Sequence, residues 1–199
     1  MGYHESLTEG RNAVLEAFRS GKTVDRLFVL DGCQDGPVKT ILREAKKQDT
    51  MVQYVKKERL DQLSETKNHQ GVIAYCAACE YAEVSDILEN AKKKGEAPFI
   101  VLLDGIEDPH NLGAIIRTAN QAGAHGVIIP KRRAVGLTAT VARTSAGAVN
   151  YTPVAKVTNL VTVMEDLKKE GMWFVCADMD GEEMYSLNLK GPIGLVIGN

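Results

Sequence analysis

The chain has 199 residues, of which 44% are hydrophobic and 25% charged, and its formal net charge is −2. This length suits one large domain or two small ones, and the composition is that of an ordinary globular protein. No apolar run approaches the roughly 18 residues that span a membrane, and the small net charge excludes a polycation that binds nucleic acid with its whole surface. Four cysteines scattered in or beside apolar runs favour a reducing, cytoplasmic compartment.

The first 78 residues alternate between helical and strand patterns. Helices are expected over 10–21, 37–48 and 57–65, and strands over 24–32, 51–57 and 71–77. Pro37 suits the first turn of the second helix. A polar bridge follows, so we predict a small α/β domain over 1–78 and a linker over 79–83.

The remaining residues have a sharper pattern. Strands are expected over 98–104, 126–130, 173–178 and 191–198, and helices over 83–95, 111–123, 136–147 and 159–171. Continuous apolar runs such as PFIVLLD are typical of strands buried on both faces. Their alternation with helices predicts a parallel sheet of βαβ crossovers over 84–199, and an α/β class for the whole chain.

Cys76 and Cys79 form a C-x-x-C pair, a pattern that can bind zinc or perform redox chemistry. A zinc site needs further ligands, and neither a second pair nor a histidine cluster lies nearby in the sequence. The simpler interpretation is two small side chains at the end of a strand, and we expect no metal.

The segment 104–123 combines a strand end, an acidic turn and a helix. Asn111 is suited to cap the helix, and apolar residues follow it at helical spacing. Arg117 lies one turn after Gly113, which has no side chain, so we expect the guanidinium over a bare patch near the positive end of the helix dipole. The prediction is an anion pocket at the carboxyl edge of the sheet. The alternative is that Arg117 pairs with Glu107 or Asp108 and only stabilises the turn.

Several common signatures are absent from the sequence. The first turn of the second half has no G-x-G-x-x-G, and there is no P-loop, H-E-x-x-H or G-x-S-x-G. A nucleotide-dependent oxidoreductase is therefore disfavoured.

Two runs of residues carry a family resemblance. The run 111–119, NLGAIIRTA, resembles the first signature motif of the SpoU/TrmH family of RNA ribose 2′-O-methyltransferases, in the SPOUT superfamily. The run 192–199, PIGLVIGN, resembles the start of the second motif, which continues in the family into a glutamate. GRNAVLEAF and NHQGVIA are similar to the family's small amino-terminal substrate-binding domain, itself like certain ribosomal RNA-binding proteins. The resemblance extends over nearly the whole chain.

The resemblance implies a fold and a function. It implies an RNA substrate-binding domain over 1–78 and a SPOUT methyltransferase domain over 84–199 that forms a trefoil knot, binds S-adenosyl-L-methionine and mediates a homodimer. The closest subgroup methylates a guanosine in large-subunit (23S) rRNA or in tRNA. The glutamate and the third motif would lie beyond Asn199, so we expect an incomplete knot and an inactive fragment. The alternative is a non-catalytic RNA-binding protein that retains the fold.

The resemblance also implies roles for individual residues. Arg117 resembles the family's catalytic arginine, and we favour a phosphate clamp over a base because arginine hardly deprotonates in proteins. Asn111 would orient Arg117 or the ribose, or serve only as the helix cap. The candidate cofactor residues are Ile197, Gly198, Asn199, Ala177, Asp178, Thr144 and Gly147, with sheet–helix packing as their alternative role. The candidate RNA-phosphate contacts are Arg11, Lys131, Arg132, Arg133 and Arg143.

Overall fold

The computed structural model of the protein describes residues 6–198. They divide into two compact units, an N-terminal unit (Met1–Glu80) and a C-terminal unit (Tyr81–Asn199). The division falls within the segment 79–83 that the sequence suggests as a linker. Among the described residues, no helix is both long enough and apolar enough to cross a bilayer.

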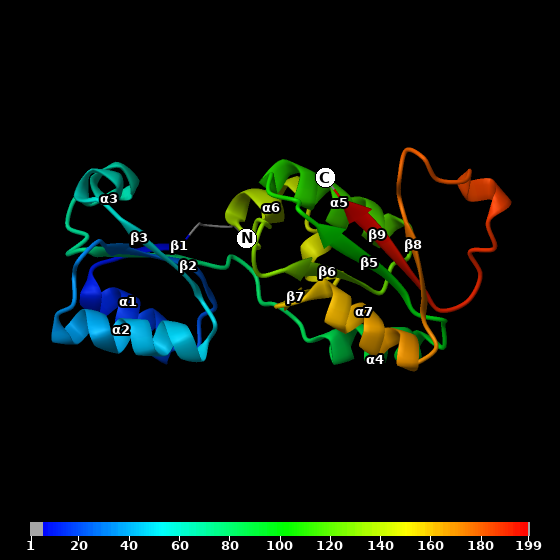
Figure 1. The fold of residues 1–199 in the computed structure, drawn as a ribbon, viewed down its shortest axis with the longest axis horizontal. Coiled ribbons are helices and arrows are strands. Elements are labelled where there is room, and N and C mark those ends of the chain that lie inside the picture. Colours follow the sequence, from blue (N-terminus) through cyan, green and yellow to red (C-terminus); the bar gives the residue numbers. More distant parts are fainter. Residues whose placement is uncertain (1–5, 199) are drawn as a thin grey trace. The chain divides into compact units, whose positions relative to one another are not determined.

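The N-terminal unit is a four-stranded sheet with helices on both faces (Figure 1). Its elements are β1 (Ser6–Glu9), α1 (Arg11–Arg19), β2 (Val24–Leu30), α2 (Gly36–Lys47), β3 (Met51–Val55), α3 (Lys57–Leu63) and β4 (Val72–Cys76). The strand order is β1-β4-β2-β3, with β2 and β3 parallel and β4 antiparallel to both of its neighbours. The edge strand β1 was not predicted.

The two faces of this sheet bury separate cores. The helical stripes of α1 and α2, with Val14, Phe18 and Ile41 among them, pack on alternate residues of β2 and β4. Leu60 of α3 packs on the opposite face against Phe28 and Ile73. Residues of the central strands therefore alternate between two covered faces, which explains why β4 (VIAYC) is apolar throughout.

The C-terminal unit is a five-stranded sheet in which every pairing is parallel, as predicted. Its first elements are α4 (Val84–Lys94), β5 (Phe99–Asp104), α5 (Pro109–Gln121), β6 (Gly126–Pro130), α6 (Ala139–Thr144) and the 3-10 turn η1 (Ala148–Asn150). The others are β7 (Val154–Val157), α7 (Leu160–Lys169), β8 (Trp173–Cys176), the 3-10 turn η2 (Met184–Ser186) and β9 (Ile193–Gly198).

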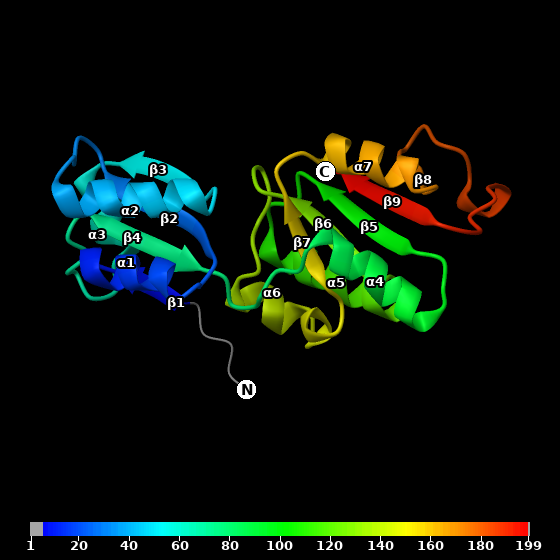
Figure 2. The same ribbon diagram turned by 90° about the horizontal axis from the view of Figure 1, so that it is seen from below.

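The strand order β7-β6-β5-β9-β8 inserts the last strand between β5 and β8. Helices α4 and α7 cover one face, and α5 and α6 lie on the other (Figures 1 and 2). The core between the sheet and the α4–α7 face contains Ile87, Ile100, Leu102, Ile128 and Leu167. The trefoil knot implied by the resemblance remains a prediction.

Strand β7 and helix α6 differ from what the sequence predicts. Strand β7 was not predicted, and the helix expected over 136–147 is shortened to the six residues of α6. The backbone N–H of Leu137 donates to the Tyr81 hydroxyl at 2.8 Å, and the Thr138 side chain caps α6. Gly147 adopts a left-handed conformation (φ 85°) after the helix. These local contacts start the helix late and end it early.

Candidate functional site

The candidate site lies where the parallel strands of the C-terminal unit end. The last residues of β5 and β9, Asp104 and Gly198, are paired in register, and β8 ends beside them at Cys176. The loop after β5 is joined to the loop after β6 by a hydrogen bond from the N–H of Val135 to the carbonyl of Ile106 at 3.0 Å. Ligands of open α/β sheets bind at this edge, so these loops form the expected location for chemistry.

Helix α5 starts two residues earlier than expected, and the prediction that Asn111 is its N-cap is wrong. Asp108 is the N-cap, and its side chain accepts from the N–H of His110 at 2.9 Å. Pro109 occupies the first helical position, where a missing N–H costs nothing. Asn111 therefore lies inside the first turn with an exposed side chain, and Asp108-Pro109 is the signal that the sequence offered.

The prediction of an open space beside Gly113 is also wrong, because the C-terminal end of α6 fills this space. A Cβ atom on Gly113 would lie 1.9 Å from Thr144 Oγ1 and 3.0 Å from the backbone nitrogen of Ser145. Gly113 is buried, whereas Arg117, one turn later, is exposed. The glycine serves the close approach of two helices rather than an open anion pocket.

Arg117 has an exposed guanidinium. Within residues 6–198 it forms no ion pair or hydrogen bond, and in particular none with Glu107 or Asp108. The alternative prediction, that Arg117 pairs with one of these carboxylates and only stabilises the turn, is therefore wrong. Because Gly113 and Arg117 are four residues apart, Arg117 lies on the flank of α5 that faces α6.

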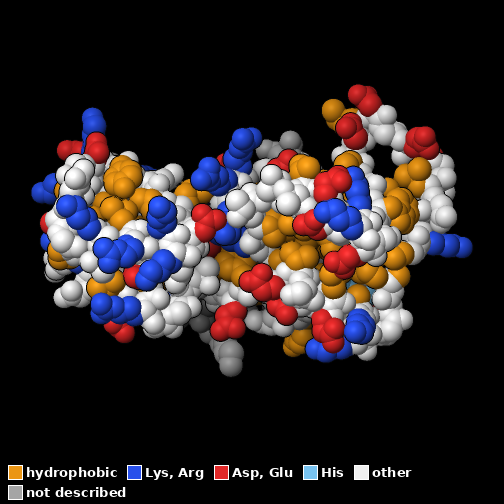
Figure 3. All heavy atoms as spheres, turned by 60° about the horizontal axis from the view of Figure 1, so that its bottom comes forward, with side chains coloured by type: hydrophobic (Ala, Val, Ile, Leu, Met, Phe, Trp, Pro, Cys, Tyr) orange, Lys and Arg blue, Asp and Glu red, His pale blue; other side chains and the backbone are white. Residues whose placement is uncertain are grey.

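A pocket of about 680 Å³ lies between β8, β9 and the loop 177–192. Its walls include Val175, Leu187 and Leu195, and its polar groups include Asp178 and Glu182. The loop projects from the body of the unit (Figure 1) and carries acidic and hydrophobic side chains at its surface (Figure 3). A smaller apolar groove of about 240 Å³ lies between α5 and strands β5 and β9, and shares Phe99 and Leu195 with the pocket.

The structure brings together only some of the candidate cofactor residues. Ala177 and Asp178 line the larger pocket, Ile197 lines the groove, and Gly198 ends β9 at the same edge. Asn199 lies outside the described residues. Thr144 and Gly147 line neither cavity; Thr144 packs against α5, with its hydroxyl donating to the carbonyl of Thr140 at 2.9 Å. Arg117 also lines neither cavity.

The candidate RNA-binding cations fall into two groups. Arg132 and Arg133 are exposed in the loop after β6, beside Lys131, and Arg143 is exposed on α6 with an Nη2 donor to Thr140 Oγ1 at 3.2 Å. Arg11 belongs to the N-terminal unit. Its guanidinium forms an ion pair with Asp35 at 2.6 Å and donates to the carbonyl of Gln70 at 3.0 Å. The Arg11 guanidinium is therefore already occupied by contacts within the N-terminal unit.

Family models match both units of the chain. Residues 98–199 match the SpoU rRNA Methylase family, and residues 7–82 match the RNA 2′-O ribose methyltransferase substrate binding family. The chain is 47% identical over 192 residues to YacO of Bacillus subtilis (strain 168), which is assigned to the TrmH family of tRNA/rRNA methyltransferases; the match covers 96% of this chain and 76% of YacO. A TrmH family relative from Staphylococcus haemolyticus (strain JCSC1435) is 44% identical, with the same coverage. This chain belongs to the SpoU methyltransferase family.

Solved structures agree with this assignment at the level of fold. The SpoU methyltransferase AviRb from Streptomyces viridochromogenes, crystallised with AdoMet, has a TM-score of 0.53 and 23% identity over 98% of this chain and 73% of its own. An rRNA methyltransferase from Sinorhizobium meliloti has a TM-score of 0.51 and 26% identity over 97% of this chain and 70% of its own. The predicted cofactor, S-adenosyl-L-methionine, is confirmed for the family.

The pocket beside β8 and β9, together with the strand end at Gly198, fits a cofactor of this kind. The larger pocket has the size of a small-molecule site and is mostly apolar, with a few polar groups. Apolar walls suit an adenine ring, and the carboxylate of Asp178 suits ribose hydroxyls. Among the described residues, and apart from its neighbours in the chain, a Cβ placed on Gly198 would meet only the carbonyl oxygen of Asp104, at 3.9 Å. The strand end is therefore open for a ligand to approach closely.

The sequence did not reveal a polar cleft in the substrate-binding unit. The cleft measures about 440 Å³, and the residues that line it are Leu7, Glu9, Gly10, Asn12, Ala13, Glu65, Thr66, Asn68 and Gln70. The clustered amides of GRN and KNHQ were the available signal, but more than fifty residues separate the two stretches in the chain, and only the fold shows that they meet.

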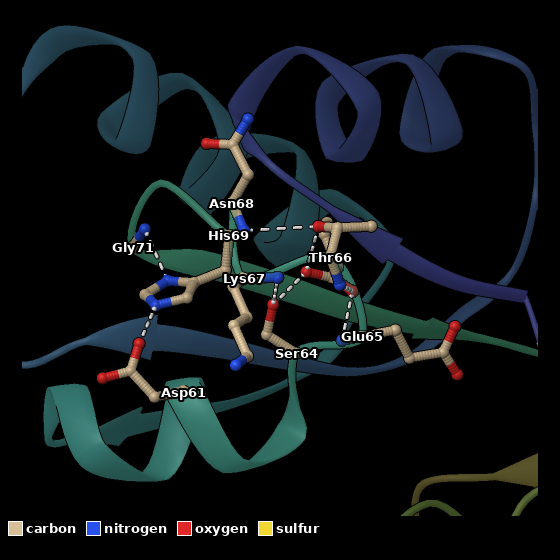
Figure 4. Close-up of polar contacts among 9 residues, drawn as sticks. Asp61, Ser64, Glu65, Thr66, Lys67, Asn68, His69 and Gly71 are labelled. Atoms are coloured by element: carbon tan, nitrogen blue, oxygen red, sulfur yellow. Dashed lines mark hydrogen bonds and ion pairs between the residues drawn. The ribbon is translucent and has the colours of Figure 1, made fainter.

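A hydrogen-bond network holds the loop on one side of this cleft. The Glu9 carboxylate accepts from Ser64 Oγ, from the N–H of Glu65 at 2.7 Å and from both the N–H and the hydroxyl of Thr66, at 3.2 and 2.9 Å. Burial acts to raise the pKa of Glu9, but these hydrogen bonds outweigh it and lower that pKa below its ordinary value. Buried His69 closes the loop, since its ring contacts Asp61 and accepts from the N–H of Gly71, both at 3.0 Å (Figure 4).

The C-x-x-C pair separates into two environments. Cys76 ends β4 and belongs to the core under α1 and α2, whereas Cys79 lies beyond the strand and is half-buried. Both thiols are free, and the described residues contain no group of three metal-ligating side chains.

Proposed function

We propose that the protein is an S-adenosyl-L-methionine-dependent methyltransferase that modifies a ribose 2′-hydroxyl, on a guanosine of 23S rRNA or of tRNA. The observation that carries the proposal is the exposed guanidinium of Arg117, which has no partner within residues 6–198 and lies on the helix that begins at the carboxyl edge of the sheet. The family assignment supports methyl transfer to RNA, and the choice of the ribose hydroxyl rests on the resemblance of the first motif.

The pocket at β8 and β9 would hold the cofactor. S-adenosyl-L-methionine supplies an electrophilic methyl group carried on a sulfonium. Ala177 and Asp178 would line its site, with Ile197 and Gly198 on the neighbouring strand and Asn199 next in the sequence, and the apolar walls would exclude water from it. For Thr144, the observed packing against Gly113 of α5 supports a structural role instead, and for Gly147 the left-handed backbone (φ 85°) after α6 does so.

The RNA would be held by cations on α5 and the adjacent loop. A hydroxyl is a poor nucleophile unless its position is fixed, and a clamp on the adjacent phosphate fixes it. Arg117 stays protonated and offers a planar fork for phosphate oxygens, so we assign it this clamp. Asn111, exposed in the first turn of the same helix, would orient the ribose, and Arg132, Arg133 and Arg143 would contact flanking phosphates.

The N-terminal unit would bind the substrate RNA. Its α1–α2 face carries Lys and Arg side chains across its surface (Figure 3). Those that are exposed, and that form no ion pair within the described residues, are Arg19, Lys22, Lys39, Arg43 and Lys46. Such a face attracts phosphates without selecting a sequence. Arg11 contributes less than expected because Asp35 already neutralises it.

We further propose a cytoplasmic homodimer formed through the C-terminal unit. The groove between α5 and β9 leaves apolar residues such as Ile115 and Ile197 only partly covered, and partly covered apolar surface of this kind favours association. Light scattering of the purified protein would give twice the monomer mass.

The decisive experiment measures transfer of labelled methyl groups to unmodified rRNA and tRNA by the full-length protein. Alkali cannot cleave beside a 2′-O-methyl ribose, so the label should remain in an alkali-resistant dinucleotide. We expect Arg117→Ala to lower kcat/KM by about 100-fold or more, through loss of positioning, with Lys169→Ala as the unaffected control.

Normal turnover of the Arg117 variant at saturating RNA would contradict the clamp. RNA binding by the wild type without any methyl transfer would favour the non-catalytic binding protein.

A further inference from the structure

The cleft of the N-terminal unit presents unpaired hydrogen-bonding groups. Asn12 and Asn68 are exposed, and within residues 6–198 neither side-chain amide has a hydrogen-bond partner. Gln70 uses its Oε1 to accept from the N–H of Arg11 at 3.2 Å, which leaves its NH₂ group available. In Figure 4 the Asn68 amide extends away from the hydrogen bonds that fix the loop. These amides can therefore bind a ligand without breaking the fold.

The frame around these amides is fixed. Glu9 ties β1 to residues 64–66, and His69 ties the loop to α3 through Asp61. Two contacts from Arg11, one to Gln70 and one to Asp35, join the start of α1 to the same loop and to the start of α2. The cleft is thus held open before any ligand arrives, and less conformational entropy is lost on binding.

The charges of the cleft decide which ligand it suits. Glu9 and Glu65 both line it, and two carboxylates repel a phosphate. Amides offer donors and acceptors together, and a carboxylate accepts from amino groups; this combination matches the edge of a nucleobase. Leu7 and Ala13 supply apolar wall for the flat face of a base. The volume of about 440 Å³ is within the range of small-ligand sites.

We propose that this cleft binds one unstacked nucleobase of single-stranded RNA and that Asn12, Asn68 and Gln70 recognise its edge. The inference rests on the proposed function, because it assigns the base-selective part of the substrate-binding unit. Proteins that select RNA sequences generally bind splayed bases in loops and single strands rather than paired helices. The cations on α1 and α2 supply affinity, and the amide cleft supplies the choice of base.

The test compares RNA selectivity between two variants of the full chain. Fluorescence anisotropy would measure affinity for labelled RNAs of about 12 nucleotides, namely oligo(A), oligo(C), oligo(U) and alternating (GU), together with a duplex of equal length. The test variant is Asn12→Ala/Asn68→Ala. The control is Gln53→Ala, which removes an exposed amide from β3 outside the cleft. Equal thermal midpoints would show that both variants are folded.

We expect the wild type to prefer one single strand over the others and over the duplex. The double variant should lose about tenfold or more in affinity for that RNA. Its affinity for the other RNAs, and its dependence on salt, should not change, because no phosphate contact is removed. Gln53→Ala should match the wild type throughout.

Two outcomes would overturn the proposal. If the double variant keeps the wild-type preference, the cleft does not select a base, although RNA binding and methyl transfer remain intact. If all RNAs weaken equally and the salt dependence falls, the cleft contacts phosphate instead. A wild type that binds none of these RNAs, nor rRNA or tRNA, would reject both this inference and the proposed function.

Discussion

The two units build their candidate sites from different interactions. In the C-terminal unit the groove is bounded by helix α5 and strands β5 and β9, and the pocket by strands β8 and β9 and the loop 177–192; the walls of both are mostly apolar. In the N-terminal unit the cleft is bounded by a loop that is held by carboxylate and imidazole hydrogen bonds, and its walls are mostly polar. The first arrangement suits a cofactor with a large apolar ring, and the second suits a ligand recognised by its edges.

This difference separates two kinds of sensitivity to mutation. A packed site fails when volume is added, because its neighbours cannot move aside. A hydrogen-bonded loop fails when an acceptor is lost or protonated, because its donors are then unpaired. Single substitutions in each unit therefore test this contrast.

Gly113→Ala should destabilise the C-terminal unit by about 2–3 kcal/mol. Alanine is the better helix former by about 1 kcal/mol, but its Cβ would meet Thr144 Oγ1 at 1.9 Å and the Ser145 backbone at 3.0 Å. Overpacking against α6 therefore outweighs propensity. Emission from Trp173, the single tryptophan of the chain, would follow this unit through denaturant unfolding.

Gly36→Ala provides the control for this substitution. Gly36 begins α2, and apart from its chain neighbours no described residue lies within 4 Å of the position a Cβ would take. The change should be neutral or stabilise the protein by a few tenths of a kcal/mol, since alanine reduces the freedom of the unfolded chain. A Gly113→Ala protein as stable as the wild type would show that α6 adjusts freely, and would remove the contrast between the units.

Asp35→Ala should cost about 1–2 kcal/mol and Asp108→Ala about 1 kcal/mol or less. Both residues cap a helix, Asp35 through the N–H of Val38 and Asp108 through that of His110. Asp35 also accepts from Arg11, in a half-exposed ion pair that adds little. Hydrogen exchange of peptides from each unit would locate the two losses. Equal losses would mean that the additional contact with Arg11 has no measurable effect.

The sequence predicted the parallel sheet of the C-terminal unit because each buried strand is a continuous apolar run. It did not predict β1 (SLTE) or β7 (VAKV), because such four-residue strands are too short to carry a clear periodicity. The start of α5 was misplaced because Asp108 and Asn111 are both good caps, and the choice depends on the proline between them.

From the sequence, only those site residues that lie at the ends of strands could be predicted. Ala177, Asp178, Ile197 and Gly198 lie at one edge, as parallel strands require. The role of Gly113 was not predictable, because only the packing of α6 shows that the space beside it is filled. The amide cleft depends on contacts between residues 9–13 and 65–70, which no local pattern encodes.

The N-terminal unit should lose stability in acid through Glu9. Hydrogen bonds lower its pKa in the folded state below the ordinary value of 4.5. A carboxylate with a lowered folded pKa stabilises the protein above its unfolded pKa, and this contribution disappears as the pH falls through the folded pKa. We expect Glu9→Gln to reduce stability at neutral pH by about 1 kcal/mol and to flatten the loss below pH 4.5.

Hydrogen exchange of residues 60–72 between neutral and acidic pH would measure this effect, with Glu16→Gln as the control. Glu16 is exposed on α1, and within the described residues its side chain has no hydrogen bond or ion pair. The control should keep the wild-type dependence on pH. A Glu9→Gln protein with the same acid sensitivity as the wild type would mean that other groups control the loop.

The smallest predicted effect concerns the reactivity of thiols in the two units. Burial raises the pKa of Cys79, so a smaller fraction is thiolate at neutral pH, and its half-buried position also limits access. Cys176 ends β8 with an exposed side chain. Iodoacetamide should therefore modify Cys176 first and Cys79 up to about tenfold more slowly, as followed by peptide mass spectrometry. Cys79 lies next to Glu80, the last residue of the N-terminal unit. Equal rates for the two thiols in the folded protein would therefore indicate that the end of this unit opens readily.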